Sequence, residues 1–131
     1  MYKFSKKSKK VLSTCDPVLQ SVMEDVLLYK DISIISGHRG SEEQDKLFAE
    51  GKSKLKYPNS KHNSNPSKAV DVAPYPHDWS RPDPRELFLI AGLVKGIGLA
   101  YGVNITWGGD WDNDGDITDQ KFQDLYHFEI S

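Results

Sequence analysis

Two segments of this chain have the apolar composition of β-strands but carry ionisable side chains. Ala69–Pro74 is apolar except for Asp71, and Tyr126–Ile130 is aromatic or aliphatic except for His127 and Glu129. Side chains of a strand point alternately to the two faces of a sheet. Each segment therefore predicts a strand with one face packed on a core and an opposite face that carries polar groups.

The rest of the chain divides into helical and strand patterns. Apolar residues at helical spacing predict helices, and short β-branched runs predict strands. Ser5, Asp16 and Ser41 are expected to begin the first three helices, Ser41 as part of a capping box. The predicted helices cover about 5–12, 17–30, 41–51 and 85–101, and the predicted strands 32–36, 69–74, 105–107 and 126–130.

These elements follow one another without a regular alternation of strand and helix. We therefore predict an α+β fold, with a small, mostly antiparallel sheet and flanking helices. A chain of 131 residues is long enough for one hydrophobic core and too short for two ordinary domains. We expect a single domain that spans residues 1–131.

The composition is that of an ordinary globular protein, with a net charge of -2 and 37% hydrophobic residues. The lysine-rich first helix is interpreted as a solvated face. No apolar run reaches the ~20 residues that a membrane span needs, and the N-terminus lacks the apolar middle of a signal peptide. We expect a monomer without a membrane span or a nucleic-acid partner, kept in the cytoplasm of the cell that makes it.

Any metal site in this chain needs histidine and carboxylate ligands, because Cys15 is the only cysteine. Asp71 is costly in an apolar strand unless its charge is paired or bound to a metal. His127 poses the same question in the terminal strand, and His62 lies in a polar loop. Convergence of these three residues would give a catalytic zinc its three protein ligands and leave a position for water. The alternative is a separate hydrogen-bonding role for each.

Two further residues have the types that catalysis at such a metal requires. Asp124 precedes His127 by three residues, so it could take a proton from the attacking water and return it to the leaving amine. Arg39 follows a strand and Gly37, and its guanidinium could stabilise an oxyanion or bind a substrate carboxylate. The structural alternatives are a surface role for Asp124 and a salt bridge for Arg39.

The acidic segment 110–116 resembles the first half of a calcium-binding loop. Such loops place acids at the first, third and fifth positions and a glycine at the sixth. The matching residues here are Asp110, Asp112, Asp114 and Gly115, followed by Asp116. The twelfth position is Lys121 rather than Glu, so the bidentate closing ligand is absent. The segment is either a calcium site or a solvated acidic turn.

Several motifs together resemble those of zinc peptidases of the D-Ala-D-Ala carboxypeptidase and VanY type. The closest resemblance is to the small phage endolysins that are L-alanyl-D-glutamate peptidases. The motifs are Ser60-x-His62, Ala69-x-Asp71, Ser36-Gly37-His38-Arg39 with Gln44, Trp107-Gly108-Gly109-Asp110-Trp111 and Asp124-x-x-His127-x-Glu129. The similarity covers nearly the whole chain. One departure is the loop 63–67, which is longer than usual and has no glycine.

The resemblance implies a hedgehog/DD-peptidase-like fold and a set of site residues: zinc on His62, Asp71 and His127, catalysis by Asp124 and Arg39, and substrate contacts by Ser60 and Gln44. It implies a lytic phage enzyme, held in the host cytoplasm until lysis, that hydrolyses the stem peptide of peptidoglycan as an L-alanyl-D-glutamate endopeptidase. Two alternatives are a D-alanyl-D-alanine carboxypeptidase and a catalytically silent cell-wall-binding relative.

Overall fold

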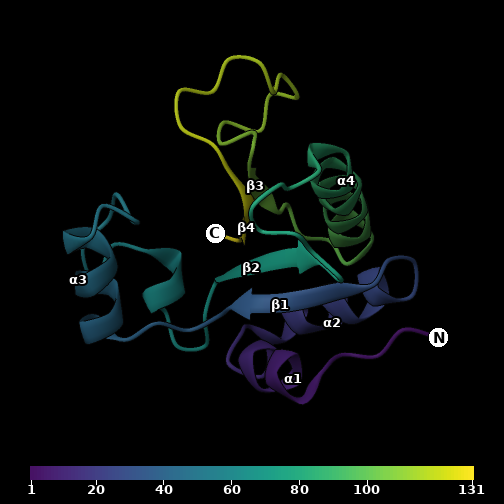
Figure 1. Ribbon diagram of the computed structural model, residues 1–131, viewed down its shortest axis with the longest axis horizontal. Helices are drawn as coiled ribbons and strands as arrows, with labels where there is room; N and C mark the ends of the chain where they lie inside the picture. Colours follow the sequence, from purple (N-terminus) through teal and green to yellow (C-terminus); the bar gives the residue numbers. More distant parts are fainter.

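Four α-helices, one short 3-10 helix and four strands form the structure, a computed structural model that describes residues 1–131 (Figure 1). The helices are α1 (Lys6–Leu12), α2 (Pro17–Leu27), α3 (Ser41–Ala49) and α4 (Pro84–Ala100), and the 3-10 helix η1 is Lys61–Asn63. The strands are β1 (Ile32–Ser36), β2 (Ala69–Pro74), β3 (Thr106–Gly108) and β4 (Asp124–Glu129).

The four strands form one sheet in the order β1-β2-β4-β3, and every pair is antiparallel. β2 and β4 are therefore the two central strands. In their ladder Asp71 lies directly opposite His127, so the polar residues of the two strands are cross-strand neighbours. The α+β class and the antiparallel sheet confirm the prediction from the sequence.

Helices α1, α2 and α4 cover one face of the sheet, and the core lies between them and the strands. The strand residues in this core alternate along the chain, as Val70 and Val72 do on either side of Asp71. The helices contribute Leu12, Leu19, Val22, Met23, Val26, Ile90 and Val94. The opposite face of the sheet is thereby left to Asp71 and His127.

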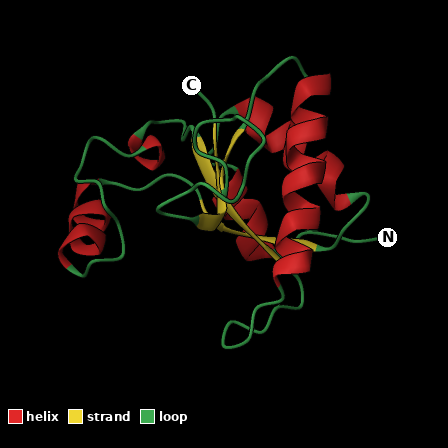
Figure 2. Cartoon of the chain, turned by 90° about the horizontal axis from the view of Figure 1, so that it is seen from above, coloured by secondary structure: helices red, strands yellow, loops and turns green.

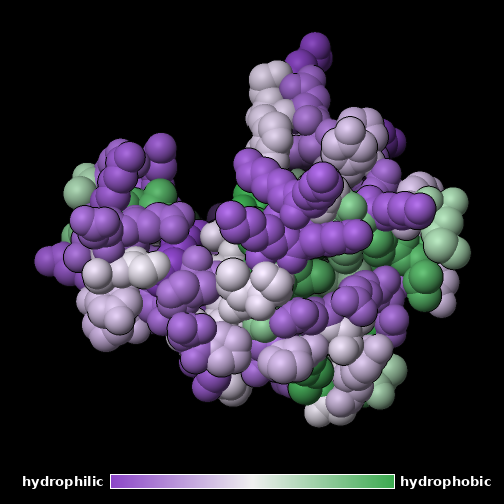
Figure 3. All heavy atoms as spheres, turned by 90° about the horizontal axis from the view of Figure 1, so that it is seen from below, coloured by the Kyte–Doolittle hydropathy of each residue, from purple (hydrophilic) through white to green (hydrophobic).

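Helix α3 and η1 lie to one side of the sheet, away from the other helices (Figures 1 and 2). No residue of α3 belongs to the hydrophobic core, and the space-filling view shows this end of the molecule as mainly hydrophilic (Figure 3). The loop between β3 and β4 projects from another side of the sheet (Figure 1). None of the helices is long and apolar enough to cross a membrane.

The helix starts differ from the sequence prediction in one place. Ser5 and Asp16 accept backbone N–H bonds at the starts of α1 and α2, as predicted. The capping box predicted at Ser41 is wrong, because Ser41 is already inside α3 and the preceding residue, Gly40, has no side chain to cap with. The capping box of this chain lies instead at Ser60, before η1, in a segment predicted as loop.

β4 begins at Asp124, two residues before the predicted start, and its register against β3 shifts between Trp107 and Gly108. Phe128 is buried in the core as predicted. Tyr126 was expected on the same face, but it lies outside the core and its hydroxyl is bonded to His77. The irregular strand also lets Asp124 and His127 line one pocket, although strict alternation would separate them.

Candidate metal centre

Three potential metal-binding atoms meet on the face of the sheet opposite the core. His62 Nε2 lies 3.3 Å from Asp71 Oδ1 and 3.3 Å from His127 Nδ1, and the latter two atoms are 3.1 Å apart. His62 comes from η1, Asp71 from β2 and His127 from β4. The structure therefore brings together the three residues that the sequence suggested as ligands, and they form a candidate metal site.

In each imidazole, the ring nitrogen that points away from the other two ligand atoms is hydrogen-bonded to an acceptor. His62 Nδ1 lies 2.7 Å from the carbonyl oxygen of Gly37, and His127 Nε2 lies 2.8 Å from a carboxylate oxygen of Glu129. Carbonyl and carboxylate oxygens only accept, so these two nitrogens carry the protons. The lone pairs of His62 Nε2 and His127 Nδ1 therefore face Asp71, in the tautomers that metal ligation requires.

Three acceptor atoms this close together need a cation among them. Burial disfavours charge on Asp71, but the adjacent His127 and His62 side chains outweigh it and hold the pKa of Asp71 well below its ordinary value. Burial alone would lower the pKa of His127, but Asp71 and Glu129 raise it to about 9. Both shifts indicate that positive charge among these atoms stabilises the site.

Local structure fixes His62 before any metal binds. Ser60 Oγ accepts the backbone N–H of His62, and Ser60 N donates to Asn63 Oδ1, which closes the first turn of η1. The carbonyl of His62 accepts from Arg39 N at 2.7 Å. These bonds tie η1 to the segment after β1 and hold the imidazole in a buried position.

Arg39 lines the pocket at the centre and contacts the carboxylate oxygen of Asp71 that does not face the histidines. Its NH2 donates to Asp71 Oδ2 at 3.2 Å, and its NH1 donates to Gln44 Oε1 at 3.4 Å. Gln44 is fully buried and also donates to Ser53 Oγ and the carbonyl of Leu55. This burial leaves Gln44 no surface for the substrate contact that was expected of it, and its contacts instead position Arg39 and the loop after α3.

A pocket of about 130 Å³ opens beside His62 and His127, and Asp124 is also among its lining residues. Burial, and then the negative charge of Asp71, raise the pKa of Asp124 above its ordinary value. Gly108 permits this arrangement, because a Cβ there would lie 2.0 Å from the carbonyl oxygen of Asp124. The other wall is basic: Arg39, Lys52, Lys54 and Lys61.

The family of phage L-alanyl-D-glutamate peptidases matches the chain over residues 1–131. The chain belongs to this family. The L-alanyl-D-glutamate peptidase of Escherichia phage T5 is 33% identical over 138 residues, with 98% of each chain covered. The crystal structure of the Serratia marcescens L-Ala D-Glu endopeptidase ChiX matches with a TM-score of 0.73 at 23% identity, over 98% of this chain and 90% of that one, which shows the shared fold.

Membership of the phage L-alanyl-D-glutamate peptidase family confirms the activity that the resemblance implied. The chain is a phage peptidase that hydrolyses the L-alanyl-D-glutamate bond in peptidoglycan. Sequence reasoning missed two groups that orient the histidines of this peptidase, Glu129 and the carbonyl of Gly37. The sequence contained a signal for Glu129, because it follows His127 by two residues in a strand and so lies on the same face. A backbone carbonyl has none.

The acidic loop of this peptidase gathers three of its four predicted calcium ligands. Carboxylate oxygens of Asp110, Asp112 and Asp114 lie within 4.8 Å of one another. Asp110 is buried and its Oδ1 has no hydrogen-bond partner. Asp116 lies outside this group and accepts from Thr118. Calcium binding by the loop stays a prediction.

Proposed function

We propose that this peptidase depends on zinc, and that His62 Nε2, an Asp71 oxygen and His127 Nδ1 hold the ion. The observation that carries the proposal is their spacing of 3.1 to 3.3 Å. Zinc ligands at 2.0–2.1 Å in a tetrahedron are about 3.3 Å apart, so these atoms need little movement to bind it. Three protein ligands leave the fourth position open, as in catalytic rather than structural zinc sites.

Zinc bound here would supply a Lewis acid that polarises the scissile carbonyl and activates the attacking water. Asp124 lies in the same pocket, and its raised pKa suits a group that must both take and give a proton. In our proposal Asp124 accepts a proton from the attacking water. It then delivers that proton to the amine of D-Glu as the peptide bond breaks.

Arg39 supports this reaction from the pocket wall. Its guanidinium is held by Asp71 and Gln44, so its positive charge stays beside the reacting carbonyl and can stabilise the developing oxyanion. Ser60 also lines the pocket. We propose that Ser60 contacts substrate at its rim and that Gln44 acts through Arg39.

We further propose that the peptidase stays in the host cytoplasm until lysis and acts as a monomer. Its L-alanyl-D-glutamate specificity suits a lytic role. A carboxypeptidase leaves existing cross-links intact, whereas cleavage between L-Ala and D-Glu detaches the peptide from the glycan. As a second ligand we propose calcium in the loop 110–116, supported by the unpartnered Oδ1 of buried Asp110.

The test is digestion of purified peptidoglycan by the zinc-loaded protein, followed by mass spectrometry of the new termini. We expect peptides with a free D-Glu amine and glycan that retains L-Ala. Asp71→Asn should abolish this release, and Asp119→Asn, in the exposed part of the acidic loop, should not. Equal release by the metal-free protein, or by Asp71→Asn, would contradict the proposal.

A further inference from the structure

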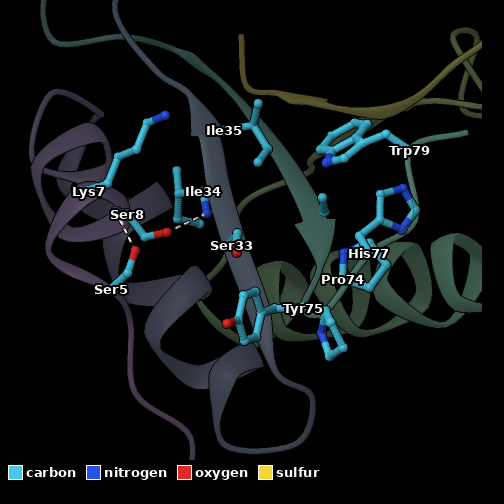
Figure 4. A pocket seen from close by; sticks show the side chains of 12 residues that line it. Ser5, Lys7, Ser8, Ser33, Ile34, Ile35, Pro74, Tyr75, His77 and Trp79 are labelled. Atoms are coloured by element: carbon cyan, nitrogen blue, oxygen red, sulfur yellow. Dashed lines mark hydrogen bonds between the residues drawn. The ribbon is translucent and has the colours of Figure 1, made fainter.

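A second cavity, of about 390 Å³, lies where the open face of the sheet meets the edge strand β1 and helix α1 (Figure 4). Ser33 and Ala73 form part of its floor and are cross-strand partners in β1 and β2. Ala73 is two residues from Asp71, so their side chains point to the same face. The cavity is thus a separate space along the strand from the proposed zinc ligands.

One wall of this cavity is aromatic. Trp79 packs against Tyr126, with ring centroids 5.2 Å apart, and edge-on against His77 at 4.7 Å. His77 Nε2 and the Tyr126 hydroxyl are 2.9 Å apart, which fixes the group. Trp79 nevertheless remains 56% exposed. An ordered aromatic ring held at the surface, outside the core, is typical of a binding site.

The facing wall is polar and lacks acids. It consists of Ser5, Lys7 and Ser8 from the start of the chain and α1, and no carboxylate lines the cavity. In Figure 4 Lys7 and Ser8 lie on one side of β1 and the Trp79 and His77 rings on the other, with Ile35 between them. A ligand suited to these walls has an apolar ring face for tryptophan and oxygen acceptors for hydroxyl and ammonium groups. An N-acetylated sugar ring has both.

The spacing between Asp71 and the floor of the cavity is compatible with the covalent structure of the substrate. Two residues along a strand separate Asp71 from Ala73, which is about 7 Å. In peptidoglycan an alanine and a lactyl group separate the scissile carbonyl from the muramic acid ring. These two residue-like units also span about 7 Å when extended.

The charge of the metal pocket supports the same orientation. Lys52, Lys54 and Lys61 line the metal pocket, but none of them lines the aromatic cavity. The free carboxylates of the stem peptide all lie on the D-Glu side of the scissile bond, and the sugar lies on the L-Ala side. Lysines at one end and aromatic rings at the other complement the two halves of this substrate.

We propose that the aromatic cavity binds the N-acetylmuramic acid ring to which the stem peptide is attached. The proposal rests on the proposed function, because the metal centre sets the position of the scissile bond. Binding of the sugar would make the enzyme prefer peptides still attached to glycan over free peptides. Trp79 would then determine specificity without taking part in the chemistry.

The test compares kcat/KM for two soluble substrates, a disaccharide that carries the stem peptide and the same peptide with an acetyl group in place of the sugar. Wild type should prefer the first by about tenfold, the factor that ~1.4 kcal/mol of binding provides. Trp79→Ala should lose this preference but keep the rate on the sugar-free peptide. Trp79→Phe should retain most of the preference for the sugar-bearing substrate. Tyr29→Ala, which changes an exposed aromatic residue elsewhere on the surface, should retain the full preference.

Binding of the sugar can also be measured without catalysis. Peptide-free N-acetylglucosaminyl-N-acetylmuramic acid should shift the indole N–H signal of Trp79 in an NMR titration and leave that of buried Trp107 in place. Three results would each overturn the proposal. They are equal kcat/KM values of the wild type for both substrates, an equal loss of kcat/KM on both substrates in Trp79→Ala, and an unshifted Trp79 signal. Failure of the proposed function would appear instead as no hydrolysis of the sugar-free peptide.

Discussion

His127 connects more of the site than any other residue. Its Nδ1 faces Asp71 and His62, its Nε2 bonds Glu129, and its ring packs at 5.3 Å from that of Trp111 in the acidic loop. The ring orientation is therefore set by the protein, and the lone pair that would bind zinc points at the other two ligands before the ion arrives. Such preorganisation raises metal affinity.

Glu129 is the residue on which this orientation depends. Glu129→Ala removes the acceptor of the His127 Nε2 proton, so we expect zinc affinity to fall about 10- to 100-fold with the fold retained. Competition with a fluorescent chelator measures the affinity, and exposed Glu24→Ala is the matched control. An unchanged zinc affinity would show that Glu129 does not orient His127.

Asp124 is expected to act on protons rather than on the metal. Asp124→Asn keeps the shape of the side chain but cannot accept a proton, so kcat should fall by roughly 10²- to 10⁴-fold while zinc content stays at the wild-type level. Stopped assays on the sugar-free peptide, with metal analysis of the same sample, check both quantities. Near-normal turnover in a zinc-loaded variant would assign Asp124 a merely structural role.

At the scale of single residues, the sequence predicted site residues where a polar side chain interrupts an apolar segment. Asp71 could be singled out because it interrupts an apolar strand, and the structure places it between two histidines. Burial of Gln44 could not be foreseen, because it depends on the loop after α3 folding back over the amide. Nothing in the local sequence encodes that long-range contact.

At the scale of elements, the pairing of β2 with β4 creates the metal centre. β1 and β2 were predicted within their observed bounds, because short β-branched runs and alternation mark strands locally. The register that sets Asp71 opposite His127 joins residues 56 positions apart and has no local signal. The resemblance to a known family supplied that information.

The loop between β3 and β4 connects the acidic cluster to the metal centre. Trp111 follows Asp110 in sequence, contacts the His127 ring and donates its indole N–H to the carbonyl of Phe122. A ligand that ordered the carboxylates of Asp110, Asp112 and Asp114 would also order Trp111. Calcium is therefore expected to affect activity as well as stability.

Millimolar calcium should raise the melting temperature of the zinc-loaded protein, since a ligand of the folded state stabilises it by RT ln(1 + [L]/Kd). For a chain of this size each kcal/mol corresponds to about 4 °C. The Asp112→Ala, Asp114→Ala double variant should lose the response in a thermal shift assay. Identical melting temperatures for the wild type with and without calcium would show a solvated turn.

At the scale of the whole molecule, one hydrophobic core contains residues of α1, α2, α4 and all four strands. We propose that residues 1–131 form a single domain, and that this core unfolds as a unit. Circular dichroism and the fluorescence of buried Trp107 should give one coincident transition in urea. Two separated transitions would contradict a single domain.

The central claim is that zinc on His62, Asp71 and His127 performs the hydrolysis. Anomalous diffraction at the zinc edge, from crystals of wild-type protein that is active on peptidoglycan, tests it most directly. We predict an anomalous peak about 2.0–2.2 Å from His62 Nε2, an Asp71 oxygen and His127 Nδ1. Active protein with no peak among these three side chains, or with its zinc held by other residues, would contradict the claim.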